Sequence, residues 1–322
     1  MRNISQPIDR FLNTWSDKSD ILPDALKMVS YEGKVLALPY SITSQGDVID
    51  KDLFIDSGVP IPTTWDEVLM AATRTRRINP DGTIQVYGWA TRFNSTANFH
   101  QLEMFMNMLG TTMVEANAKK AQINNDYGRR ALTFFREAVE AGAPNTLATV
   151  SNSMFKENRI AMYSAMQSNQ IDSLGDREQL NLDYIPCVGP TPDRSGAMVN
   201  GGALILSTNS KHPELAWQVM VAFMERQTLK SHVLAHGAAL PVRMSLFNDY
   251  DLHASQWATS LFSVLRPPLY KVDTYHPYNS EFRAGVGSQI YQAIRGEIPI
   301  GEALVQAEAH VNQVLADLMG KD

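Results

Sequence analysis

The stretch YEGKVLALPYSITSQGDVIDKDLFIDSGVPIPTTWDEV, residues 31–68, decides the fold predicted for this chain. Its apolar run 35–38 is typical of a buried strand. We expect Pro39 to end that strand, because proline has no N–H to donate to a strand ladder. The small polar residues 41–46 are unlike a core and predict a crossing segment after the strand.

Two helices are predicted after this crossing. The first covers residues 51–56 and is expected to end at Gly58, where a left-handed residue is needed. The second begins at Trp65, because Thr64 and Glu67 form a capping box. In such a box the Thr hydroxyl accepts from the Glu N–H while the Glu side chain reaches back.

The rest of the chain alternates helix and strand signals. We expect strands at 84–90, 160–162, 182–186 and 200–207, and helices over 65–78, 99–109, 126–142 and from 213 onward. This alternation predicts doubly wound α/β lobes. At 322 residues the chain exceeds what one hydrophobic core usually holds, so two lobes are expected.

Composition excludes several classes of function. The net charge of −6 argues against a nucleic-acid-binding surface. A single cysteine, Cys187, precludes an internal disulfide and a cysteine-based zinc site. No run approaches the roughly 18 apolar residues of a membrane span. Residues 1–7 lack the apolar stretch of a signal peptide.

Further motifs recur in the order of one known family. They are the segments 33–67, 125–142, 154–162, 182–190, 201–217, 237–243 and 301–304. Together they resemble the extracellular solute-binding proteins of ABC importers, family 1, the maltose-binding-like sugar-binding group. Asn158 stands where that family usually has Gly, and Asn tolerates the left-handed conformation nearly as well.

The resemblance implies a two-lobed periplasmic-binding-protein fold of type II, an α/β fold. Each lobe would be a mixed sheet flanked by helices, and hinge strands would join the lobes. Lobe one is expected over 1–42 and 203–255, lobe two over 43–202 and 256–322, and the hinge near 40–46, 196–204 and 250–262. The family's first strand–helix units of lobe one are missing from this chain. We therefore expect either that Met1 is not the biological start or that the family's fold is incomplete here.

The resemblance also implies a function. The protein would be the binding component of an ABC importer, capturing a carbohydrate or related small polar solute between its lobes by hinge closure. It would deliver the solute to the permease's transmembrane subunits, act as a monomer without cofactor, and be periplasmic or extracellular. Two alternatives stay open: a carbohydrate-active enzyme, which needs two facing carboxyls in the cleft, and a binding protein that presents its closed form to a receptor as a sensor partner.

A sugar site needs aromatic faces for stacking, and amides, hydroxyls and charged groups for the sugar hydroxyls. Polar and aromatic residues just past the predicted strands are therefore the candidates. They are Tyr40, Ser41, Thr43, Ser44, Trp89, Arg92, Asn94, Gln167, Asn169, Asn200, Gly201, Gly202, Arg243, Tyr275, Tyr278 and Arg283.

Some candidates have a second interpretation. Trp89 and Tyr40 fit a core position as well as a cleft position. Gly201 and Gly202 allow close approach either of two backbones or of backbone and ligand. In the family a Trp often follows the Ala-Met strand, whereas this chain has no aromatic residue at 165–168, which favours a smaller or more polar ligand.

No catalytic or metal-binding motif is evident. His232 and His236 have a spacing that can hold zinc, but no third ligand is near them in sequence, so we interpret them as ordinary helix histidines. The carboxylate pairs 66/67 and 137/140 are interpreted as helix caps and solvated faces. The sequence therefore predicts neither catalytic residues nor a metal site.

Overall fold

The structure is a computed structural model and describes residues 4–115, 119–144, 153–168, 170, 174, 180–236, 240–253, 256–264 and 278–319. The chain divides into two compact units. Unit 1 comprises Met1–Ser44, Gln167–Asp172 and Val199–Leu265, and unit 2 comprises Gln45–Met166, Ser173–Met198 and Arg266–Asp322. None of the described helices is long and apolar enough to cross a membrane.

Unit 1 is built from short N-terminal elements and three later helices. The helices are α1 (Asp9–Leu12), η1 (Ser16–Asp20), α2 (Pro23–Met28), α8 (Pro213–Phe223), α9 (Arg226–His236), η4 (Met244–Leu246), η5 (Tyr250–His253) and α10 (Gln256–Val264). Its strands β1 (Ser30–Tyr31) and β2 (Lys34–Val35) form an antiparallel pair, and β9 is Leu240–Pro241.

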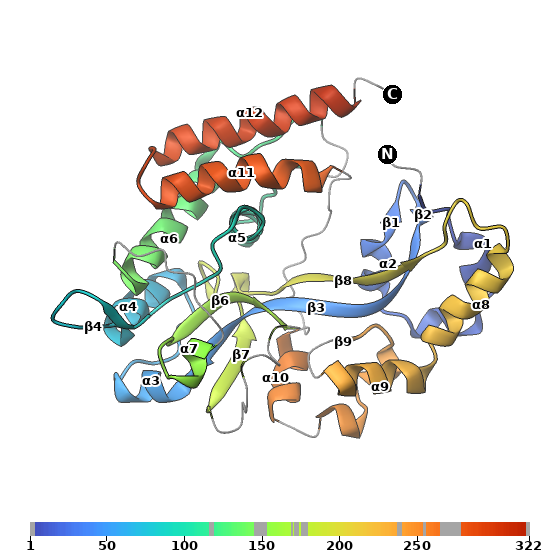
Figure 1. The fold of residues 1–322 in the computed structure, drawn as a ribbon, viewed down its shortest axis with the longest axis horizontal. Helices are drawn as coiled ribbons and strands as arrows, with labels where there is room; N and C mark the ends of the chain where they lie inside the picture. Colours follow the sequence, from blue (N-terminus) through green and yellow to red (C-terminus); the bar gives the residue numbers. More distant parts are fainter. Residues whose placement is uncertain are drawn as a thin grey trace. The chain divides into compact units, whose positions relative to one another are not determined.

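Unit 2 is the larger and more helical unit. Its helices are α3 (Lys51–Asp56), α4 (Trp65–Thr75), α5 (Ser95–Met108), α6 (Asp126–Gly142), α7 (Ser153–Lys156), η3 (Pro192–Arg194), α11 (Asn279–Ile294) and α12 (Ile300–Met319). Its strands are β4 (Arg77–Ile78), β5 (Ile84–Val86) and β7 (Leu182–Pro186). The helices α11 and α12, orange and red in Figure 1, lie side by side.

Three strands carry residues of both units: β3 (Ala37–Asp50), β6 (Met162–Gln167) and β8 (Met198–Ile205). The five-stranded sheet has the order β6-β3-β7, and β8 and β9 also pair with β3. In unit 2, β7 runs antiparallel to the second half of β3, from Gly46↔Pro186 to Asp50↔Leu182. In unit 1, β9 pairs antiparallel with β3 at Ser41↔Pro241.

The prediction that Pro39 ends the first strand is wrong. Pro39 lies inside β3, which continues through the small polar segment 41–46. That segment was expected to be unlike a core, but all of it except Thr43 is buried. Proline is tolerated where a strand has no ladder bond to donate. The antiparallel pairing of β3 with β9 begins only at Ser41, two residues beyond Pro39.

The capping box at the start of α4 is confirmed, with one change of partner. Glu67 N–H donates to Thr64 Oγ1 at 3.3 Å. Glu67 Oε2 accepts from the N–H of Thr63 at 2.7 Å rather than from that of Thr64. These bonds from Thr63 lower the pKa of the Glu67 carboxyl, because they stabilise its charged form.

Unit 2 contains a continuous hydrophobic core made chiefly by α4, α5, α6, α11 and α12. Aromatic rings form its centre: Trp65 stacks on Phe134 with centroids 4.2 Å apart, and Phe105 meets Phe135 edge to face at 5.7 Å. Such buried aromatic pairs contribute beyond their area alone.

Candidate functional site

The polar residues of β3 meet β8 within unit 1. Thr43 Oγ1 donates to Asn200 Oδ1 and also lies 3.4 Å from the carbonyl oxygen of Asn200. Two residues farther along β8, the Gly202 N–H donates to Ser41 Oγ at 3.3 Å. Thr43 and Asn200 are half-buried, so they keep part of their polar surface exposed. The structure therefore gathers these four sequence-predicted residues into one hydroxyl–amide group.

The two glycines of β8 make this close approach possible. An ideal Cβ on Gly201 would lie 2.2 Å from the carbonyl oxygen of Ser41, and one on Gly202 would lie 2.6 Å from the ring of Tyr40. Gly201 therefore allows two backbones to approach closely, which is one of the two alternatives expected for these glycines. Tyr40 is half-buried, and its ring meets His232 edge to face at 5.8 Å.

Ser44 joins β3 to the end of β6 within unit 1. Ser44 is fully buried, and its N–H donates to Ser168 Oγ at 3.2 Å. Gln167, the residue before that serine, is half-buried. Asn169 lies outside the described residues.

Arg92 and Asn94 lie in unit 2, in the segment between β5 and α5. Arg92 is exposed and lies beside Tyr163. Burial raises the pKa of the Tyr163 hydroxyl, and the positive charge of Arg92 acts in the opposite direction. Asn94 caps α5, because its Oδ1 accepts from the Ala97 N–H at 2.8 Å. Asn94 is therefore an exposed residue whose side chain has a structural role as a helix cap.

A buried polar cluster lies next to Arg92 in sequence and was missed by the sequence analysis. Thr91 Oγ1 lies 3.0 Å from Gln101 Oε1 and 3.0 Å from the carbonyl oxygen of Ser164. Gln101 Nε2 donates to Ser164 Oγ at 3.3 Å. Thr91 stands directly before the candidate Arg92, but the register that brings Gln101 and Ser164 to it is a property of the tertiary fold.

The start of α11 contributes two further candidates to unit 2. Tyr278 is half-buried and packs against the hydrophobic core. Arg283 is also half-buried, and its Nε is inaccessible and has no hydrogen-bond partner among the described residues. Buried donors are nearly always paired, so this unpaired Nε is an exception in the described part of the chain. Tyr275 lies outside the described residues.

Trp89 belongs to the core rather than to a ligand-facing surface. Its side chain is 2% exposed and meets Phe135 edge to face at 6.1 Å. An ideal Cβ on Gly142 would lie 2.2 Å from the Trp89 carbonyl oxygen, so α6 presses directly on this backbone. Between the two interpretations left open by the sequence, the structure gives Trp89 the core position.

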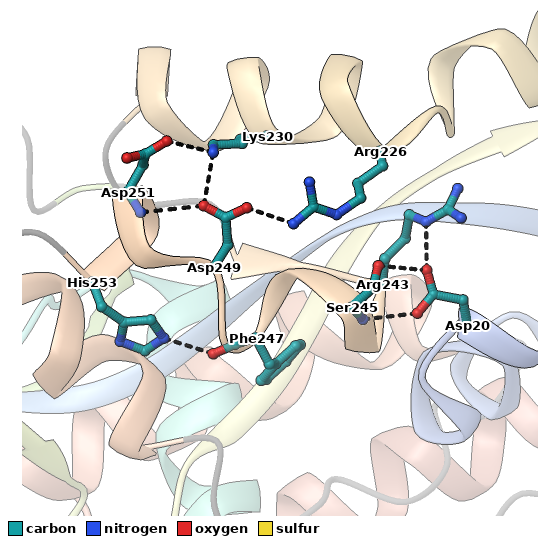
Figure 2. Close-up of polar contacts among 9 residues, drawn as sticks. All are labelled: Asp20, Arg226, Lys230, Arg243, Ser245, Phe247, Asp249, Asp251 and His253. Atoms are coloured by element: carbon teal, nitrogen blue, oxygen red, sulfur yellow. Dashed lines mark hydrogen bonds and ion pairs between the residues drawn. The ribbon is translucent and has the colours of Figure 1, made fainter.

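Arg243 is likewise a structural residue in unit 1. Its Nε donates to Asp20 at 2.7 Å, its Nη2 to Asp17 at 2.6 Å and its Nη1 to the Met224 carbonyl oxygen at 2.7 Å. Figure 2 shows Asp20 held between Arg243 and Ser245. Arg243 is only 7% exposed, so its guanidinium serves the packing of unit 1 rather than a ligand. These bonds lower the pKa of the Asp17 carboxyl.

A surface pocket of about 350 Å³ lies in unit 2, beside α4 and α6. It is lined by Trp65, Asp66, Leu69, Asp126, Arg129, Arg130, Thr133, Phe134, Glu137 and Pro190. None of the candidates from the sequence lines it. Two of its carboxylates, Asp66 and Glu137, belong to the pairs 66/67 and 137/140, which were interpreted from the sequence as helix caps and solvated faces. In the part of the chain that the structure describes, no group of three or more His, Cys, Asp and Glu is placed to hold a metal ion.

The chain is similar to known proteins in sequence pattern and in fold. Residues 6–256 match a family described as bacterial extracellular solute-binding protein. No curated protein sequence matches the chain.

Solved structures share the fold at low sequence identity. An ABC transporter solute-binding protein from Agrobacterium radiobacter K84, in complex with ribitol, has a TM-score of 0.79 and 20% identity, covering 97% of this chain and 80% of that chain. One from Thermotoga lettingae TMO, bound with alpha-D-tagatose, has a TM-score of 0.78, 20% identity and the same coverages. The sugar-binding protein MalE from Xanthomonas citri has a TM-score of 0.80 and 16% identity, covering 98% and 80%.

These neighbours confirm the predicted fold class, the periplasmic-binding-protein fold with sheets flanked by helices. The matched family and the neighbours are binding proteins of transport systems, not enzymes.

Proposed function

This chain belongs to the bacterial extracellular solute-binding proteins, and we propose that it captures a small sugar or sugar alcohol for import by an ABC permease. The observation that carries the proposal is the hydroxyl–amide group of unit 1, Ser41, Thr43, Asn200 and Gly202. Hydroxyls and amides both donate and accept hydrogen bonds, as a polyhydroxylated solute requires. The ligands named for two structural neighbours, ribitol and alpha-D-tagatose, support this class.

The expected size of the solute follows from the residues after the Ala-Met strand, 165–168. Ser168 is fully buried there and bonded to the Ser44 N–H, so no aromatic face is offered at that position. An oligosaccharide site gains much of its affinity from stacked aromatic faces. A solute of one sugar unit relies more on hydrogen bonds, and this chain supplies them.

Unit 2 would supply the remaining polar contacts. Exposed Arg92 is the donor that unit 2 would offer to solute hydroxyls. Charge-assisted hydrogen bonds of this kind are roughly twice as strong as neutral ones. A micromolar dissociation constant corresponds to about −8 kcal/mol, which several such bonds together with apolar contact can provide.

Capture would proceed by hinge closure, since a solute that binds the closed state better shifts the population toward it. In this proposal the two lobes correspond to units 1 and 2, and the hinge runs through the strands that both units share. The protein would act as a monomer outside the cytoplasmic membrane and would present its closed form to the permease. No covalent step is required for this function.

The test is a thermal-shift panel on the purified chain with ribitol, D-tagatose, other monosaccharides, disaccharides and oligosaccharides. A ligand that binds only the folded state raises the melting temperature by mass action. We expect a shift with at least one alditol or monosaccharide, and a smaller shift with its oligomers. Absence of a shift with every compound would refute the proposal.

A matched pair of variants then tests the site itself. Asn200→Ala removes the acceptor of Thr43 and should weaken binding of the active compound at least tenfold. Asn209→Ala changes an exposed asparagine of the same unit and should leave affinity unchanged. Equal affinities for the two variants would remove the hydroxyl–amide group from the site.

A further inference from the structure

The strands β3 and β6 both pass from one unit to the other. The unit boundary falls between Ser44 and Gln45 on β3 and between Met166 and Gln167 on β6. Relative motion of the units therefore involves the backbone at these two passages, together with that of β8 between Met198 and Val199. The hydrogen bonds on either side of each boundary determine which residues of β3 and β6 can change their backbone angles.

On the unit 2 side, a buried carboxylate ties β3 to two other segments. Asp47 is 1% exposed, and its Oδ1 accepts from the Ala165 N–H of β6 at 3.0 Å. Its Oδ2 accepts from the Val188 N–H, just beyond β7, at 2.9 Å. One side chain thus bonds to the backbone of two segments besides its own.

Ala165 adopts a conformation that needs such support. Its φ is +55°, in the left-handed region that non-glycine residues rarely occupy. Such residues persist only where the surroundings hold them in place. The bond from its N–H to Asp47 is a direct means of doing so.

Tyr184 of β7 makes a second tie between the same two strands. It is 1% exposed, and its hydroxyl donates to the Met166 carbonyl oxygen of β6 at 3.0 Å. Its ring lies against Gly46 of β3, where an ideal Cβ would come within 2.6 Å of it. Gly46 and Met166 are thereby fixed to one aromatic side chain.

On the unit 1 side, the Ser44 N–H donates to Ser168 Oγ at 3.2 Å. Each passage is therefore held on both sides. Between these ties lie Gln45 on β3, whose carbonyl oxygen accepts only a weak hydrogen bond from Cys187 Sγ at 3.5 Å, and Gln167 on β6.

We propose that Gly46, Asp47, Ala165, Met166, Tyr184 and Val188 form a rigid hinge block in unit 2, so that β3 and β6 bend together at Gln45 and Gln167. Asp47 and Tyr184 are its positioning residues: they touch no ligand and keep the two strands from bending independently. The proposal rests on the hinge closure of the proposed function, but its test needs no ligand.

The first measurement is the distribution of distances between two spin labels, one in each unit. Labels are placed at Gln227→Cys on α9 and Met70→Cys on α4, both of which are exposed positions. The native Cys187 is 1% exposed and stays in place. We expect Asp47→Asn and Tyr184→Phe to broaden this distribution relative to the otherwise unchanged protein, because strands that bend independently sample more orientations.

Asp50→Asn is the matched control. Asp50 lies on the same strand and is also 1% exposed, but its carboxylate caps α3 and contacts neither passage. It should leave the distribution unchanged even where it lowers the melting temperature. A hinge block is thereby distinguished from a general loss of stability.

The second measurement is amide hydrogen exchange, which locates the effect. Asparagine has one accepting oxygen where aspartate has two, so Asp47→Asn should speed exchange at Ala165 or Val188 at least tenfold. Tyr184→Phe removes one hydroxyl only and keeps the proposal testable if Asp47→Asn does not fold. Distributions as narrow in both folded variants as in Asp50→Asn would overturn the proposal, whatever the sugar panel shows.

Discussion

The interactions that stabilise the interior of unit 1 differ from those that stabilise the interior of unit 2. The large continuous hydrophobic core lies entirely within unit 2 and includes aromatic residues of α4, α5 and α6. Unit 1 has its own buried apolar residues, and ion pairs also connect some of its elements. Hydrophobic burial is non-directional and scales with area, whereas ion pairs need particular partners in particular places.

Two groups of ion pairs in unit 1 are drawn in Figure 2, which omits Asp17. In the first, Asp249 accepts from Arg226 at 2.6 Å and from Lys230 at 2.8 Å, which links α9 to the segment before η5. The bonds from Lys230 lower the pKa of the Asp249 carboxyl. In the second, Arg243 binds Asp17 and Asp20 of η1.

Helix α8 extends the contrast. Only Met220 of its eleven residues is buried, whereas Leu215, Val219 and Phe223 are 59%, 58% and 54% exposed. These three residues are four apart and so share one face of the helix. Helix α8 of unit 1 therefore leaves a row of apolar side chains exposed.

The largest expected effect comes from the core of unit 2. Phe135→Ala should lower the free energy of unfolding by about 3–5 kcal/mol, because it leaves a cavity among fully buried rings. Denaturant titration followed by tryptophan fluorescence measures this loss. A cost below about 1 kcal/mol would contradict the view that this cluster carries the stability of unit 2.

The next effect is a pH dependence located in unit 2. Burial raises the pKa values of Asp47 and Asp50 to about 6 each, despite hydrogen bonds that act in the opposite direction. Between about pH 4 and pH 6 these two groups bind more protons in the folded chain than in the unfolded chain. Lowering the pH from 7.5 to 5 should therefore raise the free energy of unfolding by about 2–3 kcal/mol for the two groups together.

Denaturant titrations at several pH values measure this dependence, and Asp50→Asn should reduce its slope by about half. The carboxyls with lowered pKa values, such as Asp20 and Asp249, oppose it only at lower pH, where they become protonated. Stability that falls steadily from pH 7.5 to pH 5 would contradict the prediction.

A smaller loss is expected from the ion pairs of unit 1. Arg243→Met removes the guanidinium from two carboxylates and should cost about 2 kcal/mol, less than for a fully buried pair because Asp17 and Asp20 are partly exposed. Arg295→Met in unit 2 is the control, since Arg295 and Glu297 are both about half exposed and their pair should contribute less than the pairs of Arg243. Denaturant titration of each variant measures its loss of stability, and equal losses would contradict the prediction.

The smallest effect is expected on the exposed face of α8. Val219→Lys should change the free energy of unfolding by no more than about 0.5 kcal/mol, because the Val219 side chain is largely exposed to solvent. Thermal melting measures the change, with Met220→Lys as the contrasting variant on the buried face. A large loss in Val219→Lys would show that this face is covered by another part of the protein.

Local sequence signals predicted several elements well. The helix expected over 126–142 is α6 (Asp126–Gly142), and its N-cap is Asn125. Gly58 and Asn158 both have the left-handed φ that was expected of them. Other boundaries moved: α4 ends at Thr75 rather than 78, and β5 covers Ile84–Val86 rather than 84–90. Caps and left-handed residues depend on a few neighbours in sequence, whereas helix and strand ends also depend on distant partners.

The candidate site was predictable only in part. Thr43 and Asn200 were chosen because they flank predicted strands, and the structure brings them together. Arg243 was chosen for its place in a Pro-Val-Arg turn, but its carboxylate partners lie more than 220 residues earlier in the chain. The buried group around Thr91 escaped notice because nothing local distinguishes a polar residue that finds distant partners from one that faces solvent.

The sequence by itself determined the family, the alternation of helices and strands, and most of the caps, because each depends on residue order over short distances. The tertiary structure alone decided which polar side chains are spent on packing, as in Arg243, and which strands the Asp47 carboxylate joins. Those outcomes depend on the register between segments far apart in the chain, and the burial of each contact determines how much it contributes to stability.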